Sequence, residues 1–405
     1  MGQAMKVLQI NSVCGIGSTG RIATGIDQIL KENGNESYIA FGRGNALDCS
    51  TSIKIGTDID NYMHVAKTRL LDKHGFGSTR ATKQFITKID EVNPDIIHLQ
   101  NIHGYYLNIE LLFGFLKKRN KPVVWTLHDC WAFTGHCAHF DFINCNKWRN
   151  GCEACPQKTE YPSSLLLDNS KLNYLLKKKI FNGIEKLTIV TPSKWLTKLV
   201  EKSFFKKYPI ETIHNGIDLN IFKSVNSLFK KRHNIEDKFI ILGVARWDKR
   251  KGLEYFIELS NNLSDLYQVV IVGVTEKQKR QLPRNIIAIT QTTNVEELVE
   301  IYSAADVFVN PTLEDNFPTV NIEALACGTP VITFKTGGST ESIDENCGIV
   351  VLKGDIEKLT NAIAEVRDKG KAFYTKACIR KAKDFYNKND RFHDYLNLYE
   401  VILKV

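Results

Sequence analysis

Short apolar runs rich in β-branched residues recur along this 405-residue chain, and segments with helical spacing of apolar residues separate them. The first half contains the strand-like runs MKVLQINS, SYIAFG, DIIHLQN, PVVWTLHD, LTIVTPS and IETIHNG. The second half contains FIILGVAR, YQVVIVG, NIIAITQ, DVFVNPT, PVITFKT and GIVVL. Continuous apolar strands that alternate with amphipathic helices indicate parallel sheets covered on both faces. We therefore predict an α/β fold of two Rossmann-like, doubly wound domains, with ligands at the carboxyl ends of the strands.

A chain of this length exceeds one typical hydrophobic core, so two domains are expected. A polar, irregular segment begins near residue 218, and we place the linker there. The predicted first domain is 1–217, and it includes a cysteine-rich insertion at 130–156. The predicted second domain is 218–387. The remaining segment, 388–405, has the pattern of an amphipathic helix.

The net charge of +9 is confined to the first half of the chain. Residues 1–213 hold 28 Lys and Arg against 19 Asp and Glu, whereas residues 214–405 hold 26 of each class. Such a distribution favours an anionic partner surface, although solvated helix faces explain any single cluster, such as KKR at 117–119 or KKK at 177–179, equally well. No apolar run reaches the ~18–20 residues that span a bilayer, and the N-terminus lacks a signal-peptide pattern. We expect a cytoplasmic protein, peripheral on the anionic inner face of the plasma membrane.

Two loops in the second half carry residues suited to a nucleotide. GVARWDKRKG places Arg246 and Lys251 just past a strand, and two such cations can neutralise a diphosphate. The sequence NPTLEDNFPTVNIEALACGTPVI places Glu323 at a strand–helix junction, where a carboxylate can accept hydrogen bonds from ribose hydroxyls. A basic surface loop and a buried, satisfied carboxylate are the structural alternatives.

Histidines mark the ends of two strands in the first half. His128 and Asp129 end PVVWTLHD, and His98 and His103 lie at the end of the preceding strand, in HLQNIHGYY. All are expected at the ligand-binding edge of the sheet, although a histidine at a strand end is more often structural.

Six segments in a fixed order give a resemblance to a known family: GIGSTG at 15–20, TPSKWL at 191–196, HNGIDLNIF at 214–222, ARWDKRKG at 245–252, SAADVFVNPTLEDNFPTVNIEALACGTPVI at 303–332 and GGSTESIDENCGIVV at 337–351. Together they resemble the family 4 glycosyltransferases, which are retaining enzymes that use nucleotide sugars. The resemblance implies the GT-B fold, in which two Rossmann-like domains face a cleft. It also implies that the last helix, 388–405, crosses back to the first domain. The cysteine-rich insertion resembles that of members that build bacterial surface polysaccharides.

The resemblance assigns roles by position in the family motifs. Asp315 and Glu323 match the paired acids, but the family usually has Glu where Asp315 stands, and Glu314 is adjacent. With His128, which matches a histidine lining the reaction centre, they form the predicted catalytic set. His103 and Asp129 match no family motif, and they are expected on the acceptor side from their places at the strand ends. The donor-binding residues implied are Gly15, Gly17, Arg246, Lys251, Thr292, Glu314, Asn316, Phe317, Thr319 and Glu323.

The function implied is transfer of a sugar from a UDP- or GDP-sugar to a glycan or lipid-linked acceptor in surface polysaccharide synthesis. No cofactor is required for catalysis, since fixed cations and amide dipoles can stabilise the leaving group. A sugar-nucleotide epimerase and a non-catalytic partner that keeps the GT-B fold are the alternatives. A nucleic-acid-binding protein would leave Arg246, Lys251 and Glu323 unexplained, so no nucleic acid is expected.

Four cysteines of the insertion follow a C-x7-C-x6-C-x2-C pattern: Cys137, Cys145, Cys152 and Cys155. A C-x2-C pair is a common half of a structural zinc site, and a reducing compartment favours zinc over disulfides. His136 and His139 could each replace one cysteine. Disulfides and unligated thiols remain the alternatives.

Overall fold

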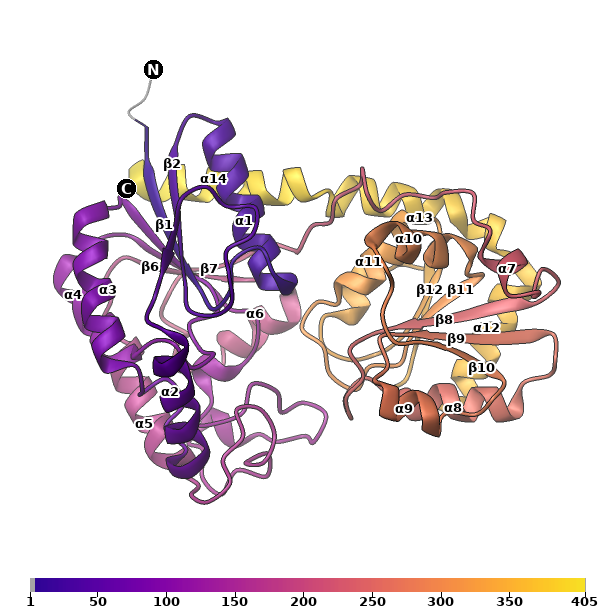
Figure 1. Cartoon of the computed structure of the whole chain (residues 1–405), viewed down its shortest axis with the longest axis horizontal. Helices are drawn as coiled ribbons and strands as arrows, with labels where there is room; N and C mark the ends of the chain where they lie inside the picture. The colour runs from indigo at the N-terminus through magenta and orange to yellow at the C-terminus, as the bar shows by residue number, and fades with distance from the viewer. Residues whose placement is uncertain (1–3, 405) are drawn as a thin grey trace. The chain divides into compact units, whose positions relative to one another are not determined.

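The computed structural model describes residues 4–404, and these form two compact units (Figure 1). The N-terminal unit holds the chain up to His214 and again from Arg391 onward, and the C-terminal unit is Asn215–Asp390. Each unit contains one all-parallel sheet flanked by helices, which confirms the predicted α/β class.

The sheet of the N-terminal unit has seven strands in the order β3-β2-β1-β4-β5-β6-β7. Its central strands are buried along their whole length, as parallel strands covered on both faces require. The strands are β1 (Lys6–Asn11), β2 (Glu36–Phe41), β3 (Ser52–Lys54), β4 (Ile96–Leu99), β5 (Val123–Thr126), β6 (Leu187–Thr191) and β7 (Ile210–Thr212). The helices are α1 (Gly17–Glu32), α2 (Asp58–Leu71), α3 (Thr79–Val92), α4 (Ile109–Arg119), α5 (Ser170–Phe181), α6 (Lys194–Val200) and α14 (Lys388–Lys404), whose first three residues lie in the other unit.

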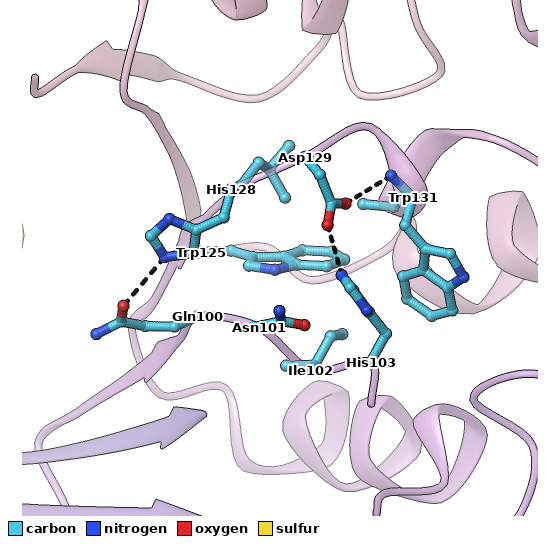
Figure 2. Close-up of a pocket in the computed structure, with 10 residues that line it drawn as sticks. Gln100, Asn101, Ile102, His103, Trp125, His128, Asp129 and Trp131 are labelled. Atoms are coloured by element: carbon cyan, nitrogen blue, oxygen red, sulfur yellow. Dashed lines mark hydrogen bonds and ion pairs between the residues drawn. The ribbon is translucent and has the colours of Figure 1, made fainter. Parts of the chain in front are cut away.

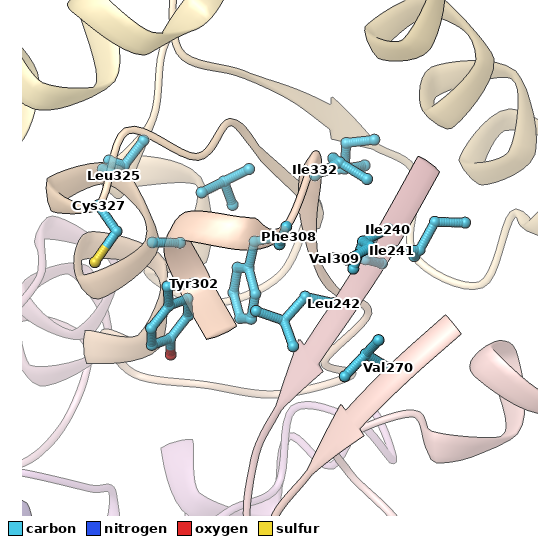
Figure 3. Close-up of a cluster of buried hydrophobic side chains, with 14 of the residues drawn as sticks. Ile240, Ile241, Leu242, Val270, Tyr302, Phe308, Val309, Leu325, Cys327 and Ile332 are labelled. Atoms are coloured by element: carbon cyan, nitrogen blue, oxygen red, sulfur yellow. The ribbon is translucent and has the colours of Figure 1, made fainter. Parts of the chain in front are cut away.

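The sheet of the C-terminal unit has six strands in the order β10-β9-β8-β11-β12-β13. The strands are β8 (Phe239–Val244), β9 (Tyr267–Val272), β10 (Ile286–Ile289), β11 (Val307–Asn310), β12 (Val331–Phe334) and β13 (Gly348–Val351). The helices are α7 (Phe229–Arg232), α8 (Leu253–Asn262), α9 (Glu276–Gln281), α10 (Val295–Ala304), α11 (Thr319–Ala326), α12 (Ile356–Lys369) and α13 (Lys371–Tyr386). Figure 3 shows side chains of β8 and β11, such as Leu242 and Phe308, in one core with Tyr302 of α10.

The C-terminal helix α14 belongs to the core of the N-terminal unit from Arg391 onward. Its Phe392 lies so close to α1 that a Cβ on Gly25 would come within 2.0 Å of the ring. Tyr395 and Tyr399 are buried beside His98 of β4. A glycine at position 25 is therefore what lets α1 and α14 approach.

Both sheets reverse their strand order at one point. β1 pairs with β2 on one side and β4 on the other, and β8 pairs in the same way with β9 and β11. Loops that leave adjacent strands in opposite directions open a crevice at their carboxyl ends, where doubly wound folds bind ligands. The loops after β1, β4, β8 and β11 are thus the ones that the topology places at binding positions.

Candidate active site

The loops after β8 and β11 meet in the C-terminal unit. Lys251 Nζ lies 2.5 Å from Asp315 Oδ2, and both side chains are largely buried. Gly252 has φ +72°, and a Cβ there would lie 2.3 Å from the carbonyl oxygen of Pro311, so only glycine allows this contact. The structure therefore brings together Lys251, which the sequence assigned to donor binding, and Asp315, which it assigned to the catalytic set, from motifs far apart in the chain.

The carboxylate that faces Lys251 is that of Asp315, and its neighbour Glu314 is 1% exposed. The backbone carbonyl of Asp315 accepts a hydrogen bond from Gly338 N–H at 3.1 Å, which fixes this part of the loop. Asn316 and Phe317 follow and are buried. Asp315 therefore occupies the position next to the cation, although it is one methylene shorter than the usual Glu.

Glu323 lies on α11 and accepts a hydrogen bond from the Tyr302 hydroxyl at 3.0 Å. Carboxylate oxygens are hydrogen-bond acceptors, so Glu323 is of the right type to accept from ribose hydroxyls. Pro318 and Thr319 begin α11 without a side-chain cap, and the helix has no acidic residue in its first turn. Its N-terminal amides can therefore face an anion.

The remaining donor residues of the C-terminal unit lie on loops. Arg246 follows β8 and is exposed, and Thr292 follows β10 and is half-buried. In the N-terminal unit, Gly15 (φ +73°) and Gly17 (φ +66°) follow β1 and open α1, where no side chain caps the helix. A Cβ at Gly15 would lie 2.3 Å from the Leu47 carbonyl oxygen, so that position also requires glycine.

A pocket of about 220 Å³, including open solvent, lies at the carboxyl ends of β4 and β5 (Figure 2). Three of the predicted residues line it, His103, His128 and Asp129, and Gln100 and Trp131 lie in its wall. These loops belong to the N-terminal unit alone. The structure thus collects the histidine and the two acceptor-side residues on one wall.

His103 is the centre of a hydrogen-bonded relay. Its Nε2 lies 2.8 Å from Asp129 Oδ2, and its Nδ1 lies 2.9 Å from the Tyr161 hydroxyl. This pattern fits a ring that donates from Nε2 to the carboxylate and accepts the tyrosine O–H at Nδ1. Although burial alone would raise the pKa of Asp129, His103 and the Trp131 N–H hold it well below its usual range. Asp129 is therefore a fixed anion that orients His103.

His128 has a different partner, since its Nε2 lies 3.1 Å from Gln100 Oε1. Burial lowers the pKa of His128 to about 4; the Asp129 charge opposes this shift and His103 adds to it. An imidazole with this pKa is uncharged at neutral pH, and since its one N–H is donated to Gln100, its other nitrogen can only accept a hydrogen bond, as from a sugar hydroxyl. Gln100 and Tyr161 were missed in the sequence, because an amide and a phenol carry no motif of their own.

Two expectations for the N-terminal unit are wrong. His98 does not open to the pocket edge: it is fully buried in β4, where Thr126 Oγ1 lies 2.8 Å from Nε2 and Tyr399 OH 2.7 Å from Nδ1. Lys177, read as part of a surface cluster, is 1% exposed and donates to the carbonyl oxygens of Trp131 and Thr134. Burial lowers the pKa of Lys177 to about 7. Both side chains hold the fold together and lie away from solvent.

The four cysteines of the insertion line one small cavity, together with Phe140 and Trp148. The rings of Phe140 and Trp148 stack at 5.2 Å, so the insertion has an aromatic core of its own. Within residues 4–404, no group of three or more His, Cys, Asp or Glu side chains is arranged to hold a metal ion. His136 is fully buried against Asp72, at 2.5 Å through Nδ1, while its Nε2 has no hydrogen-bond partner. These residues fit a metal only in part: the four thiols lie around one cavity, but they do not converge on a point where they could coordinate one ion.

Two doubly wound parallel sheets, each with candidate binding loops at its switch point, have the architecture of the GT-B fold. A family model described as Glycosyltransferase Family 4 matches residues 30–221, and one described as Glycosyl transferases group 1 matches residues 225–385. The chain therefore belongs to the family 4 glycosyltransferases and is a glycosyltransferase.

The comparisons also give relatives over the full chain. A putative colanic acid biosynthesis glycosyl transferase, WcaC of Escherichia coli K12, is 25% identical over 415 residues, which cover 98% of this chain and 100% of that protein. Sucrose-phosphate synthase from Thermosynechococcus elongatus has a TM-score of 0.72 at 19% identity, over 98% of this chain and 99% of that one. Anabaena HepE in complex with UDP has a TM-score of 0.70 at 13% identity, over 98% of this chain and 100% of that one. The two structures share the fold.

Proposed function

We propose that this glycosyltransferase moves a sugar, with retention of anomeric configuration, from a UDP- or GDP-sugar to a glycan acceptor in bacterial surface polysaccharide synthesis. The observation that carries the proposal is the Lys251–Asp315 pair at the switch point of the C-terminal sheet. The likeness to WcaC supports the polysaccharide pathway, and the fold shared with UDP-bound HepE supports a nucleotide-sugar donor.

The C-terminal unit would bind the donor through charge. When the sugar–phosphate bond breaks, its electron pair leaves with the nucleoside diphosphate, and the developing negative charge needs fixed positive partners. An ammonium group has three N–H donors, so Lys251 can hold a phosphate oxygen while Asp315 keeps it in place. Arg246 and the uncapped N-terminus of α11 would supply further donors, and Glu323 would accept the ribose hydroxyls.

The N-terminal unit would bind the acceptor through hydrogen bonds. Asp129 fixes His103, and Tyr161 donates to its other nitrogen, so the phenol oxygen could accept a hydrogen bond from an acceptor hydroxyl. His128, held by Gln100, would bind a hydroxyl of the transferred sugar. We name no protein nucleophile, because the transfer requires only that the hydroxyl reach the face that the diphosphate leaves.

The test is a panel of UDP- and GDP-sugars, measured for binding by calorimetry and for slow hydrolysis. We expect one nucleotide sugar to bind, Lys251→Ala to weaken it at least tenfold, and Lys249→Ala, a lysine exposed on the same loop, to leave it unchanged. The proposal fails if no nucleotide sugar binds. Isomerised donor without any transfer would identify an epimerase, and binding without turnover on any acceptor would identify a non-catalytic partner.

We further propose that the acceptor is lipid-linked and that the protein works at the anionic inner face of the membrane. The net charge of the first half of the chain supports this. Among residues 4–404, no helix is long and apolar enough to cross a membrane. The protein would therefore reach such an acceptor from the surface of the bilayer.

The cysteine set remains a proposed structural zinc site, with no part in catalysis. Its support is the C-x2-C pair, the common cavity and the buried Nε2 of His136, whose other nitrogen faces Asp72 as in many metal-bound histidines. Elemental analysis of anaerobically purified protein should show close to one zinc per chain, and none in a Cys152→Ser, Cys155→Ser variant. Wild-type protein without zinc would leave only packed thiols or disulfides.

A further inference from the structure

Helix α2 presents its apolar face to solvent and its polar face to the core. Ile59, Tyr62 and Met63 are 74%, 74% and 67% exposed, and Leu70 continues the same stripe. The buried residues of the helix are all polar, namely Asn61, His64 and Thr68. A helix packed on a water-soluble protein shows the opposite pattern, so the outer face of α2 is built for an apolar partner.

The segment that lies beside the end of α2 is also apolar and exposed. Leu165, Leu166 and Leu167 are 61%, 65% and 47% exposed. The N–H of Leu165 donates to the Arg69 carbonyl oxygen at 2.7 Å, and the side-chain amide of Asn169 donates to the Leu71 carbonyl oxygen at 2.7 Å. One backbone and one side-chain hydrogen bond to carbonyl oxygens of α2 therefore join the segment around Leu165–Leu167 to α2 in one surface.

Helix α5 extends this surface. Leu172 and Leu175, 48% and 55% exposed, lie on its outer side, and Asn173 bonds the carbonyl oxygen of Asp72 just after α2. We call α2, Leu165–Leu167 and the first half of α5 the leucine face. Among the described residues up to His214, only Ile16, Leu47 and Tyr161 are large exposed apolar side chains that lie outside it. Such concentration marks an interaction site.

Cations surround the leucine face. Lys67 and Arg69 lie on α2, Lys158 donates to the Leu166 carbonyl oxygen, and Lys171 begins α5. At the other end of α5, Lys117 donates to the Lys179 carbonyl oxygen, and burial lowers the pKa of Lys117 with help from Lys207 and Lys179. Neighbouring cations create a positive potential, which attracts anions.

Acidic groups of the same elements mostly have partners within the protein. Asp60 closes the capping box of α2, Asp168 accepts the N–H groups of Cys155 and Ser170, and Glu153 pairs with Lys171. Asp58 and Glu160 are the further acids near this surface. The acids and cations named at this face are similar in number, so the charge that favours an anionic partner is that of residues 1–213 as a whole, 28 Lys and Arg against 19 Asp and Glu.

We propose that the leucine face docks on an anionic lipid bilayer, with the α2 stripe and Leu165–Leu167 at the boundary of headgroups and acyl chains. An apolar strip flanked by Lys and Arg is the pattern of interfacial membrane binding. A second copy of the chain fits less well, since lysines are depleted at protein–protein interfaces. The inference locates the membrane contact of the proposed function, and its binding test needs no sugar.

The experiment is co-sedimentation of the full chain with vesicles of phosphatidylcholine alone or with 30% phosphatidylglycerol, a composition chosen at roughly the charge of an anionic leaflet. We expect binding only to the anionic vesicles, weakened at least tenfold by Met63→Asp with Leu166→Asp. Leu266→Asp is the matched control, because Leu266 is 62% exposed in the C-terminal unit, and it should bind as wild type. All three positions are exposed, and circular dichroism checks that the variants fold.

Equal binding of the wild type and the double variant to anionic vesicles would overturn the proposal, as would no binding at all. A wild-type dimer in sedimentation velocity that Met63→Asp dissociates, without vesicle binding, would assign the face to a second copy. Transfer to a water-soluble acceptor should be unchanged in the double variant. Loss of vesicle binding with intact transfer therefore separates this inference from the proposed reaction.

Discussion

The two sheets of this glycosyltransferase share a strand order around one switch point, yet their ligand-facing loops carry opposite kinds of chemistry. In the C-terminal unit the central contact is an ion pair, Lys251 with Asp315. In the N-terminal unit the pocket wall is made of hydrogen-bonded histidines, and burial lowers the pKa of His128 to about 4. A diphosphate needs fixed charge, whereas a sugar hydroxyl needs placed donors and acceptors. The two sheets have equivalent switch points, and the side chains on their loops give each unit its own chemistry.

Removal of the cation in the C-terminal unit should have the largest effect. Lys251→Ala should lower kcat/KM by roughly 100-fold or more, because it removes a charge aimed at the leaving diphosphate. Nucleotide affinity should fall with it, and Lys251→Arg should recover part of both. Steady-state kinetics and calorimetry with the nucleotide measure the two quantities. Unchanged nucleotide affinity in Lys251→Ala would break the assignment of charge recognition to this unit.

In the N-terminal unit, Asp129→Asn should lower kcat by roughly 10- to 100-fold, since an amide no longer fixes the protonated nitrogen of His103. Donor affinity should stay at the wild-type value, because no donor contact of the C-terminal unit changes. Tyr161→Phe removes the other partner of His103 and should act in the same direction. A large loss of donor affinity in Asp129→Asn would contradict the division of roles between the units.

The units should also differ in their response to acid. Burial lowers the pKa values of His64 and His98 to about 3 and of His128 to about 4, and all three lie in the N-terminal unit. In the unfolded chain these histidines take up protons near pH 6.5, whereas in the folded protein they do so only at the lower pKa values given. The stability that the uncharged, buried rings contribute is therefore fully present above pH 6.5 and is lost as the pH falls towards 4. Each group should contribute about 1 kcal/mol per pH unit in this window.

Urea unfolding followed by tryptophan fluorescence can measure this slope, since four of the five tryptophans precede His214. His98→Gln should lower the slope by about one proton relative to wild type. His233→Gln, a histidine of the C-terminal unit, is the control and should keep the wild-type slope. If His98→Gln also keeps it, His98 is not buried as an uncharged ring.

The fold could be predicted well from the sequence, because continuous apolar strands and amphipathic helices leave few alternatives to a doubly wound sheet. Among the strands of residues 4–404, only β3 (Ser52–Lys54) was missed, because a strand of three residues, two of them exposed, carries no periodic signal. The orientation of helix α2 could not be predicted, since its apolar stripe faces solvent while Asn61, His64 and Thr68 face the core. Pattern reading assumes that apolar faces point inward, and α2 violates that assumption.

The site was predictable where a motif fixed the position and less so where packing decided the role. The Lys251–Asp315 contact joins two motif residues, so both were named in advance. His98 and His103 follow the same strand and looked alike, but one points into the core under α14 and the other into the pocket. Residue spacing cannot show which histidine is buried, because His98 is covered by a helix about 300 positions away in the chain. The Tyr399–His98 hydrogen bond shows this contact.

The contrast between the buried His98 and the pocket-lining His103 gives the prediction with the smallest expected effect. Tyr399 OH lies 2.7 Å from His98 Nδ1, so Tyr399→Phe should lower the free energy of unfolding by about 1–2 kcal/mol and leave kcat/KM unchanged. Tyr395→Phe is the matched control, since its hydroxyl accepts only a longer bond, 3.3 Å from Thr126 Oγ1, and it should cost less. Urea unfolding and steady-state kinetics on the same samples make the comparison. A loss of activity in Tyr399→Phe at unchanged stability would show that His98 supports catalysis. The contrast between packed and pocket-lining histidines in this unit would then be wrong.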